Sequence, residues 1–251
     1  MGVEPVPDEP AAVADLGGER ALVVADFHAG IESGLARDGV ELPSHAADRR
    51  SSLLSLVDRE RPDRLVFLGD LGHAIGDPGR DEREEIRELF DALPTDLSVT
   101  LAKGNHDGDV ESLLADVPQP VDITPGHGRR IGDVGFAHGH TWPSPDVLSA
   151  DIVCVGHEHP VVRLEDEVGG ARVERVWLRG ELVAEPFEEY HDADLAIDGE
   201  LVVCPGFNDL SGGTWVNVAG QDFLAPFLPD GVADAEAYLL NGTRLGDYRR
   251  V

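Results

Sequence analysis

Basic residues, cysteines and long apolar runs are scarce in this chain of 251 residues. No run approaches the roughly 20 consecutive apolar residues of a membrane helix, so no membrane partner is expected. Residues 1–20 have neither a basic start nor an apolar segment, so we expect no secretory signal peptide and take cytoplasmic residence as the default. Cys154 and Cys204 both lie in apolar, strand-like runs. They are expected to be buried free thiols rather than a disulfide or a metal pair.

The charge is strongly one-sided. There are 49 acidic residues against 20 basic ones, the formal net charge is −29, and Lys103 is the only lysine. The acids are spread along the whole chain. They could form a surface for cationic partners, or suit a host living in high salt, where repulsion is screened within a few Å. We favour the halophilic interpretation. An acidic surface normally argues against nucleic acid, but at molar salt that argument weakens.

Five short apolar runs each end in potential metal ligands. Such runs, rich in Val, Ile, Leu and Phe, predict buried strands. The residues that follow them are Asp26-Phe27-His28, Asp70, Asn105-His106-Asp107, His138 and His157-Glu158-His159. In open α/β sheets, ligands bind outside the carboxyl ends of the strands. The sequence therefore predicts one convergent polar site.

The remaining pattern predicts α/β structure first and mostly β structure later. Residues 1–20 read as a loose lead-in and 21–251 as a single domain. A substrate-facing loop is expected over 26–43. Helices are expected over 44–60, 81–93 and 110–117, with the acids of 81–88 on a solvated face. Later strands are expected at 161–164, 173–178, 195–197, 201–203 and 215–218.

The donor set indicates the kind of metal. Imidazole and carboxylate ligands together suit Mn, Fe or Zn better than Mg or Ca. Seven candidates are too many for one tetrahedral zinc, and suit two ions that share a carboxylate. Two ions about 3.5–4 Å apart form a clamp for in-line displacement at phosphorus.

Taken in order, the five blocks resemble those of the calcineurin-like metallophosphoesterases. The resemblance implies a four-layer α/β/β/α sandwich with the site at the strand ends. It implies that one ion is held by Asp26, His28, Asp70 and His159. It implies that the other is held by Asp70, Asn105, His138 and His157. His106 would face the substrate phosphate, which makes His106 and the bridging Asp70 the catalytic candidates.

The branch of the family can be narrowed. Phosphoprotein phosphatases usually continue their second block with Asp-Arg-Gly, whereas this chain has Leu71-Gly72-His73. Their third block uses Glu where this chain has Asp107. The chain is instead similar to the ICC-like, SbcD-related phosphoesterases of archaea and bacteria over about 21–218. The segments that carry this similarity are 26–32, 39–43, 69–73, 156–160 and 205–208.

The resemblance implies a hydrolase that uses two divalent ions, with Mn favoured and Fe, Zn or Ni also suitable. Kinship favours a phosphodiesterase or nuclease acting on nucleic acid or a cyclic nucleotide. The alternatives are a phosphomonoesterase of small molecules, a non-catalytic metal-binding scaffold, and an accessory subunit of a DNA-processing complex. An oligomer or a partner protein is compatible with the sequence.

Several other residues have two interpretations. His73, His140 and Asn208 are candidate substrate contacts, or else structural residues. Trp142 and Trp215 could stack on a base, but burial or packing is the commoner role for Trp. Four arginines could bind phosphate, but pairing with surface carboxylates is favoured: Arg37, Arg129, Arg130 and Arg179.

Overall fold

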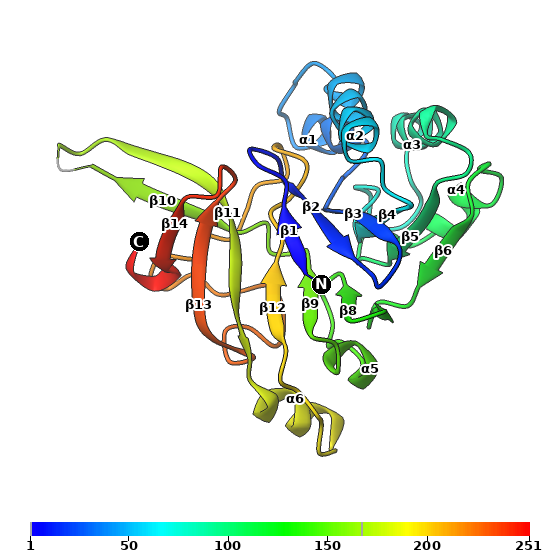
Figure 1. Ribbon diagram of the computed structural model, residues 1–251. Helices are drawn as coiled ribbons and strands as arrows, with labels where there is room; N and C mark the ends of the chain where they lie inside the picture. Colours follow the sequence, from blue (N-terminus) through cyan, green and yellow to red (C-terminus); the bar gives the residue numbers. More distant parts are fainter. Residues whose placement is uncertain (1, 167) are drawn as a thin grey trace.

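The structure is a computed structural model that describes residues 2–166 and 168–251 (Figure 1). Its first sheet has six strands in the order β1-β2-β3-β4-β5-β6. These are β1 (Val3–Pro5), β2 (Ala11–Asp15), β3 (Arg20–Ala25), β4 (Arg64–Leu68), β5 (Ser98–Ala102) and β6 (Val121–Thr124). Strands β3 to β6 are parallel, so their carboxyl ends share one edge of the sheet.

The second sheet has eight strands. Seven follow the order β14-β13-β11-β12-β9-β8-β7, and β10 pairs with β11. They are β7 (Arg129–Ile131), β8 (Val134–Ala137), β9 (Ile152–Val155), β10 (Val161–Glu165), β11 (Ala171–Leu182), β12 (Glu200–Val203), β13 (Val232–Leu239) and β14 (Arg244–Asp247). Strands β8, β9 and β12 are parallel, while the hairpin β10–β11 projects from the body (Figure 1).

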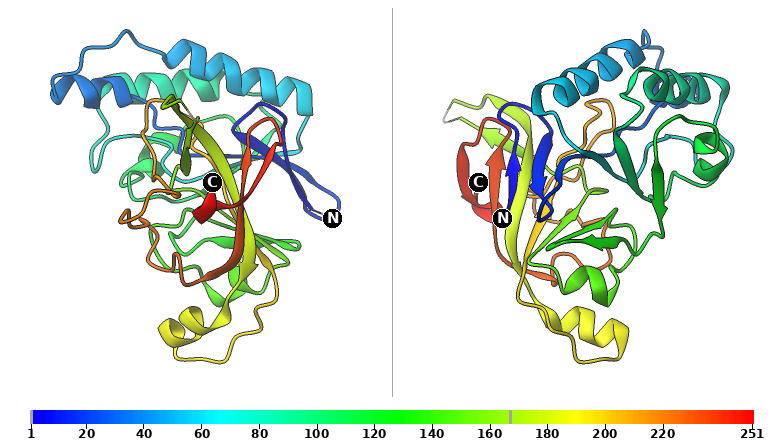
Figure 2. Two further views of the ribbon diagram at one scale, coloured as in Figure 1. Left: turned by 90° about the vertical axis from the view of Figure 1, so that its left-hand side faces the viewer. Right: turned by 45° about the vertical axis from the view of Figure 1, so that its right-hand side comes forward.

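Helices cover the outer face of each sheet. They are α1 (Ile31–Arg37), α2 (Ala46–Glu60), α3 (Arg80–Ala92), α4 (Val110–Leu114), α5 (Pro145–Leu148) and α6 (Ala184–His191), with a 3-10 turn at Tyr248–Arg250. Figure 2 shows α1, α2 and α3 together on one side of the first sheet. Among the described helices, none is long and apolar enough to cross a membrane.

The two-residue period of β3 explains how the layers pack. Leu22 and Val24 join a core with the helices, including Leu53 of α2 and Phe90 of α3. The alternate residues, such as Val23, join a separate core between the sheets. A third core packs α5 and α6 against the second sheet. The four-layer α/β/β/α sandwich expected from the sequence is confirmed, and Cys154 and Cys204 are buried and free, as predicted.

Several local expectations are wrong. The described part of the lead-in forms the hairpin β1–β2 on the edge of the first sheet. Prolines and small residues hide its strand pattern, although Ala11, Ala12 and Ala14 are fully buried. The segment 26–43 is not wholly a loop, because it contains α1.

The later half, expected to be mostly β, also contains the helix α6 between the expected strands 173–178 and 195–197. Pro186 falls in the first turn of α6, where its missing N–H costs little. Segment 195–197 has no strand partner; Leu195 instead donates its N–H to the Glu188 carboxylate at 3.0 Å. Segment 215–218 makes one bridge, between Trp215 and Val161, and forms no strand.

Candidate metal centre

The five sequence blocks converge at the strand ends. Three follow β3, β4 and β5 of the first sheet, and two follow β8 and β9 of the second. Phe207 links the sheets at this edge, because its N–H donates to the Ala25 carbonyl at 2.8 Å. The site therefore lies where the carboxyl ends of both parallel sets meet.

The backbone of the blocks is unusual. Nine non-glycine residues in the described part have positive φ, and five of them are predicted ligands: Asp26, His28, Asp70, His157 and His159. Each such residue costs on the order of 1–3 kcal/mol, and such strain clusters at functional sites. The fold thus turns these side chains inward against local backbone preference.

One group of ligands comprises Asp26, His28 and His159, whose ligand atoms lie within 4.8 Å of one another. Asp26 is fully buried, and its Oδ1 lies 3.1 Å from His159 Nε2. The His157 N–H donates to Asp26 Oδ2 at 3.0 Å. This bond fixes the carboxylate and links the first block to the last.

A second group comprises Asp70, His138 and His157. His138 Nδ1 lies 2.7 Å from the Leu68 carbonyl, which can only accept, so Nδ1 carries the proton. His138 Nε2 then faces Asn105 Oδ1 at 3.1 Å and Asp70 Oδ2 at 3.3 Å. A cation held by Nε2, Asn105 Oδ1 and Asp70 Oδ2 would satisfy all three atoms, and without one a proton on Nε2 takes that place.

Asp70 joins the two groups. Its Oδ1 accepts from the His106 N–H at 2.9 Å, which turns Oδ2 toward both sets of ligands. That Oδ2 lies 3.3 Å from His138 Nε2 and 3.8 Å from His28 Nε2. A carboxylate in this place can serve two ions.

The electrostatics suit cation binding. Burial lowers the pKa of His28 and of His157 to about 4, so both rings are neutral near pH 7 and have a lone pair to donate. Burial opposes protonation of His138 as well, but Asp70 and Asp26 raise its pKa to about 9. Burial alone would raise the pKa of Asp70, yet His138 and His28 hold it well below its usual range. The donor set therefore fits divalent cations.

His106 and His73 lie beside these groups. His106 Nδ1 donates to the His73 carbonyl at 2.5 Å, which leaves Nε2 free. Its ring stacks on that of His73, with the ring centroids 5.5 Å apart. The Nδ1 atoms of His73 and His28 lie 3.4 Å from each other. His28, His73 and His106 form a third cluster of potential ligand atoms.

The other two candidate substrate contacts, His140 and Asn208, have different surroundings. His140 lies next to His138, with ring centroids 5.3 Å apart, and its Nδ1 is buried without a partner in the described part of the chain. The Asn208 amide nitrogen donates to the carbonyls of Phe27 and His28 at 3.1 and 3.2 Å. Its side-chain oxygen accepts from the Leu210 N–H at 3.0 Å. These bonds make Asn208 a positioning residue for the first block.

Sequence reasoning assigned no role to Asp107, which holds two blocks together. It is 2% exposed, and its carboxylate accepts from the N–H groups of Leu71 at 2.9 Å and Gly104 at 2.8 Å. The sequence feature that could have indicated this role is the position of Asp107 directly after His106.

The expectation of a solvated acidic face over 81–88 is wrong at two positions. Glu82 and Glu85 are 5% and 4% exposed. Glu82 accepts from the His73 N–H at 3.1 Å. Glu85 accepts from the Gly30 N–H at 2.8 Å and makes a two-bond ion pair with Arg49 at 2.8 and 2.9 Å. These two acids point inward because hydrogen-bond and ion-pair partners lie on that side. The helical period of the sequence does not show where such partners are.

Three of the four singled-out arginines pair on the surface, as favoured: Arg129 with Asp122, Arg130 with Asp133, and Arg179 with Glu200. Trp142 stacks on Tyr190 at 4.6 Å and contacts Phe187, so it packs. Trp215 is 37% exposed.

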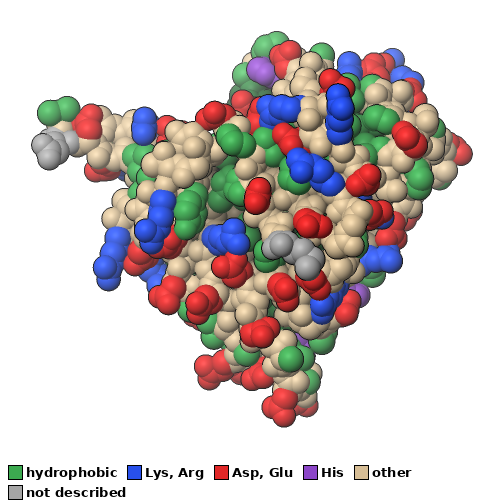
Figure 3. Space-filling model, in the orientation of Figure 1, with side chains coloured by type: hydrophobic (Ala, Val, Ile, Leu, Met, Phe, Trp, Pro, Cys, Tyr) green, Lys and Arg blue, Asp and Glu red, His purple; other side chains and the backbone are tan. Residues whose placement is uncertain are grey.

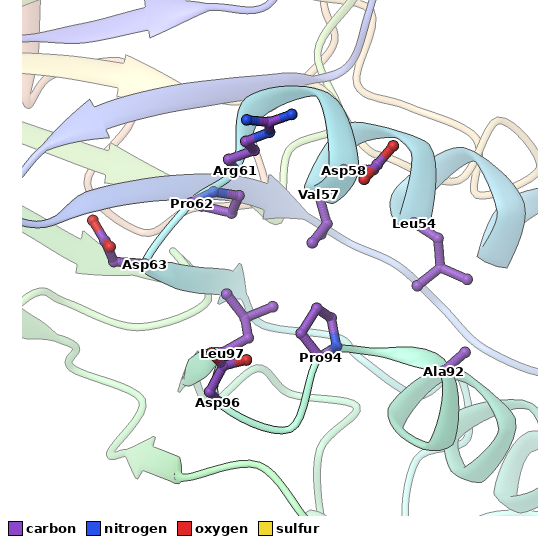
Figure 4. Close-up of a pocket in the computed structure, with 10 residues that line it drawn as sticks. All are labelled: Leu54, Val57, Asp58, Arg61, Pro62, Asp63, Ala92, Pro94, Asp96 and Leu97. Atoms are coloured by element: carbon purple, nitrogen blue, oxygen red, sulfur yellow. The ribbon is translucent and has the colours of Figure 1, made fainter.

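A cavity of about 620 Å³ lies away from the ligands, at the amino ends of β4 and β5 (Figure 4). Figure 4 shows Val57, Pro94 and Leu97 facing one another there, with Arg61 turned away. A smaller cavity, of about 340 Å³, has His159 in its wall and therefore adjoins the site.

Comparison with known proteins gives one family match. The model of the family described as calcineurin-like phosphoesterase matches residues 19–199. The crystal structure of the nuclease MPE of Pseudomonas putida is 18% identical, with a TM-score of 0.58, over 97% of this chain and 100% of that one. YfcE, a phosphoesterase from E. coli, is 16% identical over 90% of this chain and 96% of that one, with a TM-score of 0.41. No curated protein sequence matches the chain.

Proposed function

The chain belongs to the calcineurin-like phosphoesterases, and from that premise we propose that it hydrolyses phosphodiester bonds with two divalent cations. Membership makes it a metal-dependent hydrolase of phosphoester bonds. The observation that carries the two-ion proposal is the position of Asp70 Oδ2, between His138 of one ligand group and His28 of the other. Mixed imidazole and carboxylate donors favour Mn, with Fe, Zn or Ni as alternatives.

In this proposal Asp26, His28, Asp70 and His159 hold one ion, and Asp70, Asn105, His138 and His157 hold the other. When bound, the ions supply Lewis-acid activation of the phosphoryl group and of the attacking water. His106 presents Nε2 to the substrate, because its Nδ1 is engaged by the His73 carbonyl. From there it protonates the leaving oxygen or stabilises charge on the phosphoryl oxygens.

The neighbours of His106 position it. Glu82 holds the His73 backbone, whose carbonyl orients the His106 ring. His73 and His140 lie at the rim of the ligand groups, where we propose that they contact substrate. Asn208 keeps the carbonyls of Phe27 and His28 in place.

The preference for diesters is supported by the fold shared with a protein described as a nuclease, which is an analogy. We further propose that 21–251 form one domain, since residues of both sheets share one core, and the hairpin β1–β2 joins the same core through Val3, Ala12 and Ala14. Cytoplasmic residence is proposed because the buried Cys154 and Cys204 form no disulfide in the described residues, an arrangement that suits a reducing compartment.

The test is hydrolysis of bis-p-nitrophenyl phosphate against p-nitrophenyl phosphate, with added manganese, at low and high salt. Faster turnover of the diester is expected. Preference for the monoester would redirect the search to small phosphorylated metabolites. Turnover of neither, with two metals bound, would favour the scaffold or partner-dependent roles.

A further inference from the structure

Arg175 of β11 lines the same cavity as the proposed metal ligand His159 and, among the described residues, has no ion-pair partner. Its Nη1 donates to the carbonyls of Gly206 at 3.0 Å and Phe207 at 3.3 Å. Over 2–166 and 168–251, neither Nη2 nor Nε has a hydrogen-bond partner, and no carboxylate pairs with the group. Arg37, Arg61, Arg80 and Arg249 also form no ion pair in the described residues, but of these five arginines only Arg175 lines the cavity that contains His159.

The guanidinium of Arg175 is also partly shielded from solvent. Arg175 is half-buried, and burial lowers the pKa of its guanidinium, although Asp209 and Glu9 act in the opposite sense. These two carboxylates form no ion pair with Arg175, so the cost of its partial desolvation is only partly offset, and an anionic ligand in direct contact would lower it further. Arg179, on the same strand, pairs with Glu200.

The position of Arg175 connects two cavities. The cavity of about 340 Å³ contains both His159 and Arg175 in its wall. A second cavity, of about 200 Å³, shares Arg175, Asn208 and Asp209 with it. Arg175 thus lies on a hollow that starts at a proposed metal ligand and continues past the 206–209 segment.

The first cavity also has an aromatic wall. Trp215 is 37% exposed, and its backbone is held by the bridge to Val161 at the base of the projecting hairpin β10–β11 (Figure 1). Exposed indole rings next to a cation match the parts that bind single-stranded nucleic acid, in which a base stacks and a phosphate pairs.

We propose that Arg175 and Trp215 form a subsite for the nucleic-acid strand that flanks the scissile phosphate. Arg175 pairs with a neighbouring phosphate, and Trp215 stacks on a base. The inference rests on the proposed phosphodiesterase function and names its substrate class. With a net charge of −29, the chain gains no general attraction to nucleic acid, so binding depends on such local contacts.

The test compares kcat/KM for a short oligothymidylate and for bis-p-nitrophenyl phosphate in the manganese-loaded enzyme. In Arg175→Gln, kcat/KM for the oligonucleotide falls about tenfold, mainly through KM, and its salt dependence loses about one unit of slope. The small diester, which has no second phosphate, changes far less. In Trp215→Ala the loss for the oligonucleotide is about fivefold to a hundredfold, and Trp215→Phe retains most of the rate.

Arg172→Gln is the matched control. Arg172 lies three residues earlier on β11, is exposed and pairs with Glu174, so its loss changes the charge equally but leaves both rates as in the wild type. An equal loss for both substrates in Arg175→Gln would make Arg175 only a clamp for Gly206 and Phe207, and would overturn the proposal. Unchanged oligonucleotide kinetics in Arg175→Gln and Trp215→Ala would overturn it as well.

Failure of the proposed function is distinguishable. If the wild type hydrolyses no diester, fluorescence anisotropy of a labelled oligothymidylate still measures binding. Binding that is weakened by Arg175→Gln and Trp215→Ala but not by Arg172→Gln supports the subsite without the catalysis. Absence of binding refutes both proposals.

Discussion

At the scale of single residues, His106 is held in one orientation before any substrate arrives, because the His73 carbonyl engages its Nδ1. We predict that His106→Ala lowers kcat by about 10²–10⁴-fold, the usual range for loss of a positioned acid or base. Both ions stay bound, because His106 is not a proposed ligand. The measurements are kcat for bis-p-nitrophenyl phosphate and metal content by mass spectrometry.

His127→Ala is the control, because His127 is exposed and belongs to none of the five blocks. Its kinetics should match the wild type. Full activity in His106→Ala would remove His106 from the mechanism, and loss of one metal would make it a ligand.

Asp70 differs from His106 because it bears on both proposed ions. We predict that Asp70→Asn loses metal and activity together, since a neutral amide attracts both cations less. Metal content per chain and turnover are measured on the same sample, with Asp194→Asn, an exposed position, as control. Normal metal content in Asp70→Asn would refute the bridging assignment.

Gly69 precedes Asp70 with φ of +74°, and a Cβ there would overlap the His138 ring. We predict that Gly69→Ala displaces His138 and reduces both metal content and activity at least tenfold. Gly17→Ala is the matched control: its φ is +81°, but nothing lies within 4 Å of the new Cβ. It should cost about 1 kcal/mol of stability and leave activity intact. Equal activities in the two variants would show that the site tolerates a shifted His138.

At the scale of elements, the buried Arg49 ties three helices to the first ligand block. It pairs with Glu85 of α3 and Glu32 of α1, while Glu85 also holds the Gly30 N–H. We predict that Glu85→Ala destabilises the fold by about 3–5 kcal/mol, because it leaves a buried guanidinium and an N–H short of partners. Urea unfolding followed by circular dichroism measures the change in the free energy of unfolding.

Glu84→Ala is the control, since Glu84 neighbours Glu85 on α3 but is exposed. Its stability should change by less than about 0.5 kcal/mol. A loss of similar size in both variants would mean that the ion pair contributes nothing beyond helix propensity.

Helix α3 also shows what sequence can and cannot reveal. The helix was expected over 81–93 from its apolar period, and the residues that carry this period, Ile86, Leu89 and Phe90, are buried. The same pattern misplaced Glu82 and Glu85, since their partners are the backbone of Gly30 and His73 and a side chain on α2. The ligand blocks were predictable because each directly follows a strand. Arg175 was not, because its place depends on hydrogen bonds to the carbonyls of Gly206 and Phe207, which lie 31 and 32 residues later in the chain.

At the scale of the whole molecule, acidic side chains are scattered over the face seen in Figure 3, with basic ones between them. The 20 basic residues leave a net charge of −29, and at low ionic strength the folded state carries this repulsion in a small volume. Salt shortens the screening length from about 10 Å at 0.1 M to about 3 Å at 1 M. The repulsion therefore fades over that range.

We predict, from the proposed halophilic origin, that Tm rises as KCl is increased from about 0.1 to 1 M and beyond. Sucrose at matched osmolality is the control, because it favours compact states without screening charge. Asp192, Asp194 and Asp198 are exposed and, in the described residues, form no ion pair. Replacing all three by Asn removes repulsion at low salt, so this variant should gain Tm there and depend less on KCl. A Tm that is flat or falls with KCl, in both proteins, would mean that ion pairs such as Arg49–Glu85 outweigh the net repulsion, and the halophilic interpretation would be lost.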